Sequence, residues 1–168
     1  PDLDGTKREA MARTMTWMGD AMKVGLTFDS PFWRDKGYSG SVFSDQGPLS
    51  QIWDNSDGST YALAGFAFGD DMLALKQASD ADVKHSVLKQ LRRAFGANPP
   101  EPAAIVRTAW IDEPYTSAPG KWPSGARHYG RPELAATHAD KVFFAGTETE
   151  PDHGHIEGAV RSGLRAAT

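Results

Sequence analysis

A short apolar run, a glycine turn and a small-residue helix stand near the end of the chain, where together they could hold an anion. Residues 142–145 have the length and composition of a buried strand, which Gly146 and Thr147 end. One face of the helical pattern that follows consists of Ile156, Ala159, Val160 and Gly163. Free N–H groups and the positive dipole end suit a phosphate or another electron-rich ligand edge. An ordinary strand–helix packing unit without a ligand gives the same pattern.

A lysine on the polar side of an alternating segment is a second candidate for chemistry. Residues 21–28 alternate apolar and polar or small side chains, which predicts a half-buried strand. Lys23 falls on the polar face of that strand. On the pattern alone, a lysine in this position is a solvated surface residue.

The sequence motifs in these segments resemble those of a known family. F-A-G-T-E-T at 144–149, followed by E-G-A-V-R-S-G-L-R-A-A at 157–167, resembles the C-terminal flavin-binding segment of the flavin-containing amine oxidases. That family includes monoamine, polyamine and L-amino acid oxidases. Residues 22–33 are similar to the strand that carries the family's flavin-facing lysine, and residues 110–116 resemble its W-x-x-E-P-Y-S segment. The match is to the C-terminal third or so of a complete oxidase.

The resemblance implies roles for four side chains near the reacting atoms. Lys23 would hold a water near flavin N5 and assist the reaction with oxygen, and Trp110 would lie beside the flavin ring. Trp122 and His155 would form the aromatic sandwich around the substrate amine. His155 replaces the usual Tyr or Trp, and a polar imidazole that titrates near neutrality favours a substrate with a polar or anionic group, such as an amino acid. As a bare sequence feature, Trp110 is a core strand aromatic.

The resemblance also implies a non-covalent FAD site. Gly146 and Thr147 would bring the backbone close to the FAD pyrophosphate, within a motif that continues through Glu148 and Thr149. Ile156 and Ala159 would lie at the helix start, near the pyrimidine edge of the flavin. Some family members link FAD to a cysteine just before the first cage aromatic, but this chain has Lys121 there and no cysteine at all.

Composition excludes several other classes of protein. Of the 168 residues, 39% are hydrophobic and 24% charged, which is typical of a globular chain with one respectable core. A net charge of −4 with scattered basic residues predicts no nucleic-acid partner, and no apolar run approaches the ~20 residues that span a bilayer. Without cysteine, the pair His153 and His155 lacks the ligands of a metal site, so we expect no metal. The compartment is not identified by the sequence.

The pattern of elements predicts an α+β fold, with a mixed or antiparallel sheet and a C-terminal strand–helix. Asp4 is expected to cap a helix over 6–18, whose Met11, Met15 and Met18 form a packing face. A strand at 21–28, a meander over 41–68, a helix over 80–95 capped by Ser79 or Asp80, and a strand at 105–111 follow. We expect residues 1–105 to belong to a substrate-binding domain. Residues 106–168 would supply the flavin-facing strand, the aromatic loop and the C-terminal FAD-binding strand–helix.

Together these features predict a C-terminal chain or fragment of an FAD-dependent oxidase. It would oxidise a primary amine or L-amino acid to the imine, then to the aldehyde or keto acid with ammonia, and reduce O2 to H2O2. The chain has no G-x-G-x-x-G segment, so an N-terminal FAD-binding chain is an expected partner and the chain alone is expected to be inactive. The alternatives are a non-catalytic interaction module and a flavin monooxygenase or demethylase of the same family.

Overall fold

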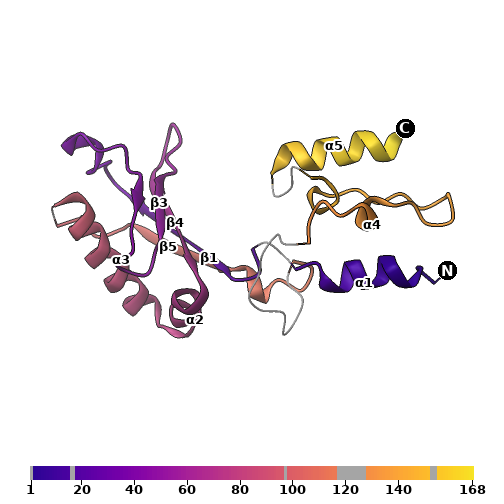
Figure 1. Cartoon of the computed structure of the whole chain (residues 1–168). Helices are drawn as coiled ribbons and strands as arrows, with labels where there is room; N and C mark the ends of the chain where they lie inside the picture. Colours follow the sequence, from indigo (N-terminus) through magenta and orange to yellow (C-terminus); the bar gives the residue numbers. More distant parts are fainter. Residues whose placement is uncertain (1, 16–17, 97, 117–127, 152–154) are drawn as a thin grey trace. The chain divides into compact units, whose positions relative to one another are not determined.

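The chain forms two compact units with different architectures (Figure 1). The computed structural model describes residues 2–15, 18–96, 98–116, 128–151 and 155–168. One unit is Asp20–Glu113, and the other joins Pro1–Gly19 to Pro114–Thr168. The expected α+β class is confirmed. Packing of the first helix with the last segment of the chain was not predicted. The assignment of residues 1–105 and 106–168 to two functional domains stays a prediction.

The Asp20–Glu113 unit is built on an antiparallel sheet of five strands in the order β2-β3-β4-β1-β5. The strands are β1 (Ala21–Phe28), β2 (Val42–Phe43), β3 (Gln51–Asp54), β4 (Tyr61–Phe68) and β5 (Ala104–Ala109). The helical elements are α2 (Gly69–Gln77), α3 (Asp80–Phe95), and the short turns η1 (Arg34–Lys36) and η2 (Trp110–Asp112). The predicted strands and the predicted helix α3 are confirmed, whereas α2 was not predicted.

The core of this unit lies between one face of the sheet and the helix α3. Met22, Val24, Leu26 and Phe28 are buried on β1 and join the core cluster with Val83, Val87, Leu91 and Phe95 of α3. Ser79 caps α3 by accepting from the Asp82 amide, and Gly96 ends the helix in the left-handed conformation that glycine adopts without strain. A helix with this buried stripe therefore covers only one side of the sheet.

Trp33 connects the turn after β1 to the sheet. Its ring is fully buried and makes edge contacts with Phe28 and Phe32. Its indole Nε1 donates to a carboxylate oxygen of Asp54 at 2.8 Å, and Arg34 donates to the same oxygen at 2.7 Å. Burial raises the pKa of the Asp54 carboxyl, but the hydrogen bonds from Arg34, Ser56 and Trp33 outweigh burial and hold the pKa well below its usual range.

The second unit contains three helices and a series of turns (Figure 1). Its elements are α1 (Gly5–Arg13), α4 (Pro132–Ala135), the short turn η3 (Thr147–Thr149) and α5 (Ile156–Ala167). Asp4 caps α1 as expected, by accepting from the amides of Thr6 and Lys7. The helix ends at Arg13, short of the predicted end, and its buried residues are Lys7 and Ala10. The predicted methionine face is therefore wrong: the helix ends before Met15 and Met18, and Met11 is 42% exposed.

Two features of the last segment differ from the expectation. The strand predicted at 142–145 is present only as a single bridge between His138 and Val142, since a strand needs a ladder partner and the described residues supply one pair. In α5 the buried residues are Gly158 and Ser162. Ile156, Val160 and Leu164 are 85%, 51% and 66% exposed, so the apolar face of α5 is uncovered by the described chain. No helix in the described part of the chain has the length and apolar character needed to cross a membrane.

Replacing Asp54 by Ala should destabilise the sheet unit. The substitution leaves the buried Trp33 N–H without an acceptor, which costs roughly 1–3 kcal/mol. Because the pKa of the folded carboxyl is lowered, its contribution to stability is present above the ordinary aspartate pKa of 3.8 and is lost as the pH falls below it. Urea unfolding monitored by tryptophan fluorescence should therefore separate Asp54→Ala from the wild type at pH 7, by a difference that shrinks progressively as the pH falls below 3.8. Asp35→Ala, an exposed neighbour in η1, is the control; equal stability of Asp54→Ala and wild type at pH 7 would contradict the role of this carboxylate.

Candidate functional site

Lys23 lies in the middle of the open face of the sheet. The register places Phe43 opposite Gln51, Gln51 opposite Phe66, Phe66 opposite Lys23, and Lys23 opposite Thr108, so one row crosses all five strands. Successive residues of a strand point to opposite faces, and the neighbours Met22 and Val24 are buried in the core. Lys23 is exposed on the face that α3 does not cover.

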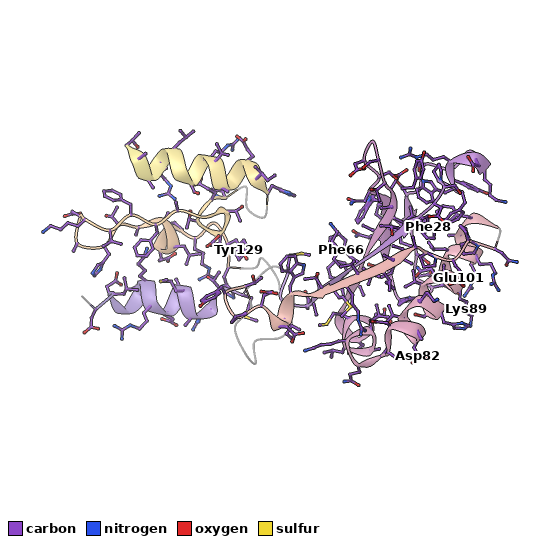
Figure 2. All side chains as sticks on the ribbon, turned by 180° about the vertical axis from the view of Figure 1, so that it is seen from behind. Phe28, Phe66, Asp82, Lys89, Glu101 and Tyr129 are labelled. Atoms are coloured by element: carbon purple, nitrogen blue, oxygen red, sulfur yellow. The ribbon has the colours of Figure 1, made fainter. Side chains whose placement is uncertain are left out.

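Aromatic rings line this open face beside Lys23. Phe43, Trp53, Phe66 and Phe68 follow one another with ring centroids 5.9, 5.8 and 5.9 Å apart. The Lys23 ammonium nitrogen lies 5.7 Å from the centroid of Phe66, within the range of a cation–π contact. Figure 2 labels Phe66 and Phe28 toward opposite ends of the sheet, and the register places Lys23 at the Phe66 end. The result is an apolar surface with one positive charge.

These aromatic residues were not predicted as site residues. Each sits in a short segment that the sequence identified only as part of a meander. The signal available was the alternation along residues 61–68, which places Phe66 and Phe68 on the side opposite Leu63 and Ala67. Assigning them to the same face as Lys23 needs the register between strands, which no single segment contains.

Trp110 lies at the same end of the sheet as Lys23. Met22 pairs with Ala109, so Trp110 follows directly after the last paired residue of β5. It begins η2, where the chain leaves the sheet, and it is half-buried. The expected strand to residue 111 therefore ends two residues early, and Trp110 stands at a sheet edge. Within the Asp20–Glu113 unit, Lys23 and Trp110 therefore lie at the same end of the sheet, and their facing one ligand stays a prediction.

In the other unit, the motif residues 146–149 form a tight turn against α5. The Gly146 amide donates to the buried Ser162 hydroxyl at 2.9 Å, and the Thr149 amide and hydroxyl donate to the Gly146 carbonyl. Gly146 has a φ of 153°, and a Cβ there would lie 2.7 Å from the Glu148 carboxylate oxygens. The positive φ therefore favours glycine at the start of the turn.

The start of α5 presents the positive end of the helix dipole. His155 is the N-cap residue, but its side chain makes no capping hydrogen bond. Its carbonyl accepts from the Thr147 hydroxyl at 3.0 Å, which ties the turn to the helix start. Ile156 and Ala159 are exposed in the first turns of the helix. Uncapped amides at a positive dipole end, next to a glycine turn, fit the phosphates or the electron-rich ring of a dinucleotide cofactor such as FAD.

Two sequence predictions fall outside the described residues. Trp122 lies in 117–127 and His153 in 152–154, so their placement is not part of the structure. Among the residues that are described, no group of three His, Asp or Glu side chains converges as a metal site would require. His155 is exposed at the helix start, in the same unit as the glycine turn.

Comparisons with known proteins give one consistent result. The family model described as flavin containing amine oxidoreductase matches residues 1–168. A probable flavin-containing monoamine oxidase A of Dictyostelium discoideum is 29% identical over 96% of this chain and 36% of its own length. An L-amino acid dehydrogenase of Synechocystis sp. is 28% identical over 89% of this chain and 33% of its own length.

Solved structures agree with the sequence comparisons. The cyclohexylamine oxidase of Brevibacterium oxydans superimposes with a TM-score of 0.79 and 28% identity, over 99% of this chain and 38% of that one. The chain therefore spans about a third of the length of the relatives it matches.

Gly130→Ala should destabilise the unit that holds the glycine turn. Gly130 has a φ of 70°, its amide donates to the Glu148 carbonyl, and an added Cβ would lie 2.8 Å from Pro151 Cα. Left-handed strain and this backbone contact should together cost roughly 1–3 kcal/mol. Gly163→Ala is the matched control, because its Cβ meets nothing and a helical alanine should stabilise by about 0.5–1 kcal/mol. Thermal unfolding measures the loss of stability expected for Gly130→Ala and the gain expected for Gly163→Ala. A stable Gly130→Ala variant would show that the segment does not need this geometry.

Proposed function

Because the chain belongs to the flavin containing amine oxidoreductase family, we propose that it forms the C-terminal part of an FAD-dependent oxidase. The substrate is a primary amine or an L-amino acid, which loses two electrons and two protons to become the imine. Water then hydrolyses the imine to an aldehyde or keto acid and ammonia, and O2 becomes H2O2. The observation that carries this proposal is Lys23 on the open sheet face, in register with an aromatic row and beside Trp110.

Bound FAD supplies the hydride acceptor and the route by which electrons reach oxygen. This chain contributes the Gly146–Thr149 turn and the uncapped start of α5, which accept close backbone contact and negative charge. The absence of cysteine makes the attachment non-covalent, at least with respect to thioether links. The other part of the FAD site lies in the two thirds of the relatives' length that this chain does not cover.

Lys23 supplies a fixed positive charge where oxygen is reduced. An ammonium group in a site closed to water stabilises the negative charge that develops on oxygen as it accepts electrons. Its position above the Phe66 ring limits its side chain to the open face of the sheet. The same ring gives the ammonium an electron-rich apolar neighbour.

The aromatic row favours a substrate with an apolar body. Phe43, Trp53 and Phe66 give a flat apolar surface, and rings of this kind contact both hydrocarbon groups and cationic amines. Gln51, between Phe43 and Phe66 in the row, adds an amide that donates and accepts. By the family resemblance, the polar imidazole of His155 favours a substrate that also carries a polar or anionic group. An L-amino acid with an apolar side chain combines both features, and a hydrophobic monoamine satisfies the first.

Lys23→Met tests the catalytic role in the complete flavoprotein. Wild-type enzyme should produce peroxide from a hydrophobic amine or amino acid. The variant should slow the reaction of the reduced enzyme with O2 by about 10²-fold, since one electrostatic contact to the developing charge is lost. Anaerobic reduction by substrate should change far less. Stopped-flow absorbance measures both steps.

Lys36→Met, an exposed lysine of η1 in the same unit, is the control and should leave both rates unchanged. Equal slowing of the two steps in Lys23→Met would argue against the assigned role. A complete protein that binds no flavin, or that forms no peroxide from any amine, would instead support a non-catalytic module.

The exposed apolar face of α5 supports an N-terminal FAD-binding partner. Ile156, Val160 and Leu164 form one stripe of a helix whose opposite side is already buried. Val142 and Phe143, 42% and 54% exposed, add apolar surface in the same unit. An uncovered apolar surface of this kind marks a contact with another polypeptide segment.

Charges placed on that stripe should therefore prevent assembly. Val160→Asp combined with Leu164→Asp should weaken association with the FAD-binding part by at least about 100-fold, because two buried apolar contacts become buried unpaired charges. Circular dichroism of the chain itself should be unchanged, since both positions are exposed. Titration calorimetry measures the association. Leu73→Asp, an exposed leucine of α2, is the control; full-affinity assembly of the double variant would exclude α5 as the contact.

A further inference from the structure

A buried lysine ties the first helix to the last segment of the chain. Lys7 is 2% exposed, and its ammonium donates to the carbonyl oxygens of Glu133, Leu134 and Ala136 at 3.0, 3.0 and 2.5 Å. Three acceptors match the three N–H donors of an ammonium group. The same nitrogen lies 3.6 Å from the centre of the Phe144 ring, so the ring face covers the remaining side of the charge.

A second cation, Arg165 of α5, hydrogen-bonds to the same segments of the chain. Arg165 donates from Nε to the Glu150 carboxylate at 2.9 Å, and from Nη2 to the Thr149 hydroxyl at 2.9 Å and the Phe144 carbonyl at 3.2 Å. Its Nη1 reaches the Ala135 carbonyl at 3.5 Å. The guanidinium therefore uses its planar fork on several acceptors at once, which a lysine at this position cannot do.

The contacts of the two cations converge on the residues just before and within the glycine turn. Lys7 and Arg165 share the four successive carbonyls of residues 133–136, and they hold Phe144 by its ring and by its carbonyl respectively. We call this arrangement of Lys7 and Arg165 the two-cation clamp.

Hydrogen bonds hold both the C=O and the N–H of Gly146, and the one to the C=O leads from the clamp. The Thr149 hydroxyl that accepts from Arg165 donates in turn to the Gly146 carbonyl at 2.8 Å. The Gly146 amide donates to Ser162, whose hydroxyl donates to the Ala159 carbonyl. Gly146 is thus fixed at its N–H and its C=O by groups of this chain alone.

Burial of the charged groups of the clamp costs free energy, which argues that the clamp has a positional role. Burying an ammonium is unfavourable unless every donor is matched, and a well-packed apolar group often stabilises as much or more. What the charges add is direction: three carbonyls must point at one nitrogen, and four acceptors at one guanidinium. The clamp therefore fixes the path of the backbone, in a unit whose other large apolar side chains are mostly exposed.

We propose that Lys7 and Arg165 are positioning residues, which set the Gly146–Thr149 turn in the geometry that meets FAD. The inference rests on the proposed function. Neither residue contacts the cofactor through the groups that form the clamp, because their donors are directed to carbonyls, a hydroxyl and a carboxylate of the chain. The effect on FAD is transmitted through Thr149 and Phe144.

The test compares Arg165→Gln, Arg165→Lys and Lys7→Met with wild type in the complete flavoprotein. FAD affinity, measured by the recovery of flavin fluorescence on dilution, should fall at least tenfold in each variant. The visible absorption band of the flavin still bound should shift, because its hydrogen-bonding partners move. At saturating FAD the substrate KM should stay within about twofold of wild type, because none of the clamp's hydrogen bonds is made with the sheet residues that we assign to substrate. Arg13→Gln, in an exposed pair with Glu9, is the control and should leave all three quantities unchanged.

A second measurement follows the turn in this chain without cofactor. The amides of Thr149 and Glu150 donate to the carbonyls of Gly146 and Thr147, so their hydrogen exchange reports the turn itself. Exchange should accelerate at least tenfold in Arg165→Gln and Arg165→Lys, and not in Arg13→Gln.

The outcomes separate this inference from the proposed function. Wild type that binds FAD together with clamp variants that bind it equally well would overturn the positioning role. A normal Arg165→Lys beside a defective Arg165→Gln would also overturn it, since charge alone would then suffice. Wild type that binds no FAD would overturn the proposed function, and the exchange rates would still decide whether the clamp orders the turn.

Discussion

The strand β1, which lies between β4 and β5, can bury only every second side chain, and this constraint arranges the whole Asp20–Glu113 unit. Met22, Val24, Leu26 and Phe28 point into the core, so Lys23 has to lie on the other face. Because β1 pairs with β4 on one side and β5 on the other, the same alternation carries across to Phe66 and Thr108. A shift of one residue in register would move Lys23 into the core and Met22 to the open face. Packing of α3 against one face thus fixes which residues are available for chemistry on the other.

The other unit is organised by polar contacts instead. Its large apolar residues, such as Phe143 and Ile156, are mostly exposed, whereas Lys7, Thr149 and Ser162 are buried. Hydrogen bonds are directional and hydrophobic contacts are not, so this unit gains a defined backbone path rather than a large core. Such an arrangement suits a segment whose apolar surface is reserved for another part of a larger protein.

The sequence predicted the elements whose signals are local. The cap Ser79, the buried stripe of α3 and the left-handed Gly96 all lie within one helix, and the alternation along β1 lies within eight residues. The site residues Lys23 and Trp110 could be assigned only through the family resemblance, and the structure brings them to the same end of one sheet.

What could not be predicted depends on contacts between distant residues. The Lys7 ammonium meets Leu134 across a separation of 127 residues, and no pattern within α1 distinguishes this lysine from a solvated one. The residues of α5 predicted to pack are exposed in the described chain, where Gly158 and Ser162 are buried instead. A periodic stripe indicates that a face will be buried, without indicating by what.

The hydrogen bonds that hold the N–H and the C=O of Gly146 affect how much conformational entropy the turn loses when a ligand binds. A loop that becomes ordered only when a ligand arrives loses about 1–2 kcal/mol per residue in backbone freedom, and that loss weakens binding. Here the turn of Gly146, Thr147 and Thr149 is hydrogen-bonded to α5 by groups of the chain itself. Its backbone has therefore lost this freedom on folding, and a ligand that meets the turn does not have to order it. Three hydrogen bonds made by the chain itself can in this way strengthen the binding of a ligand that meets the turn.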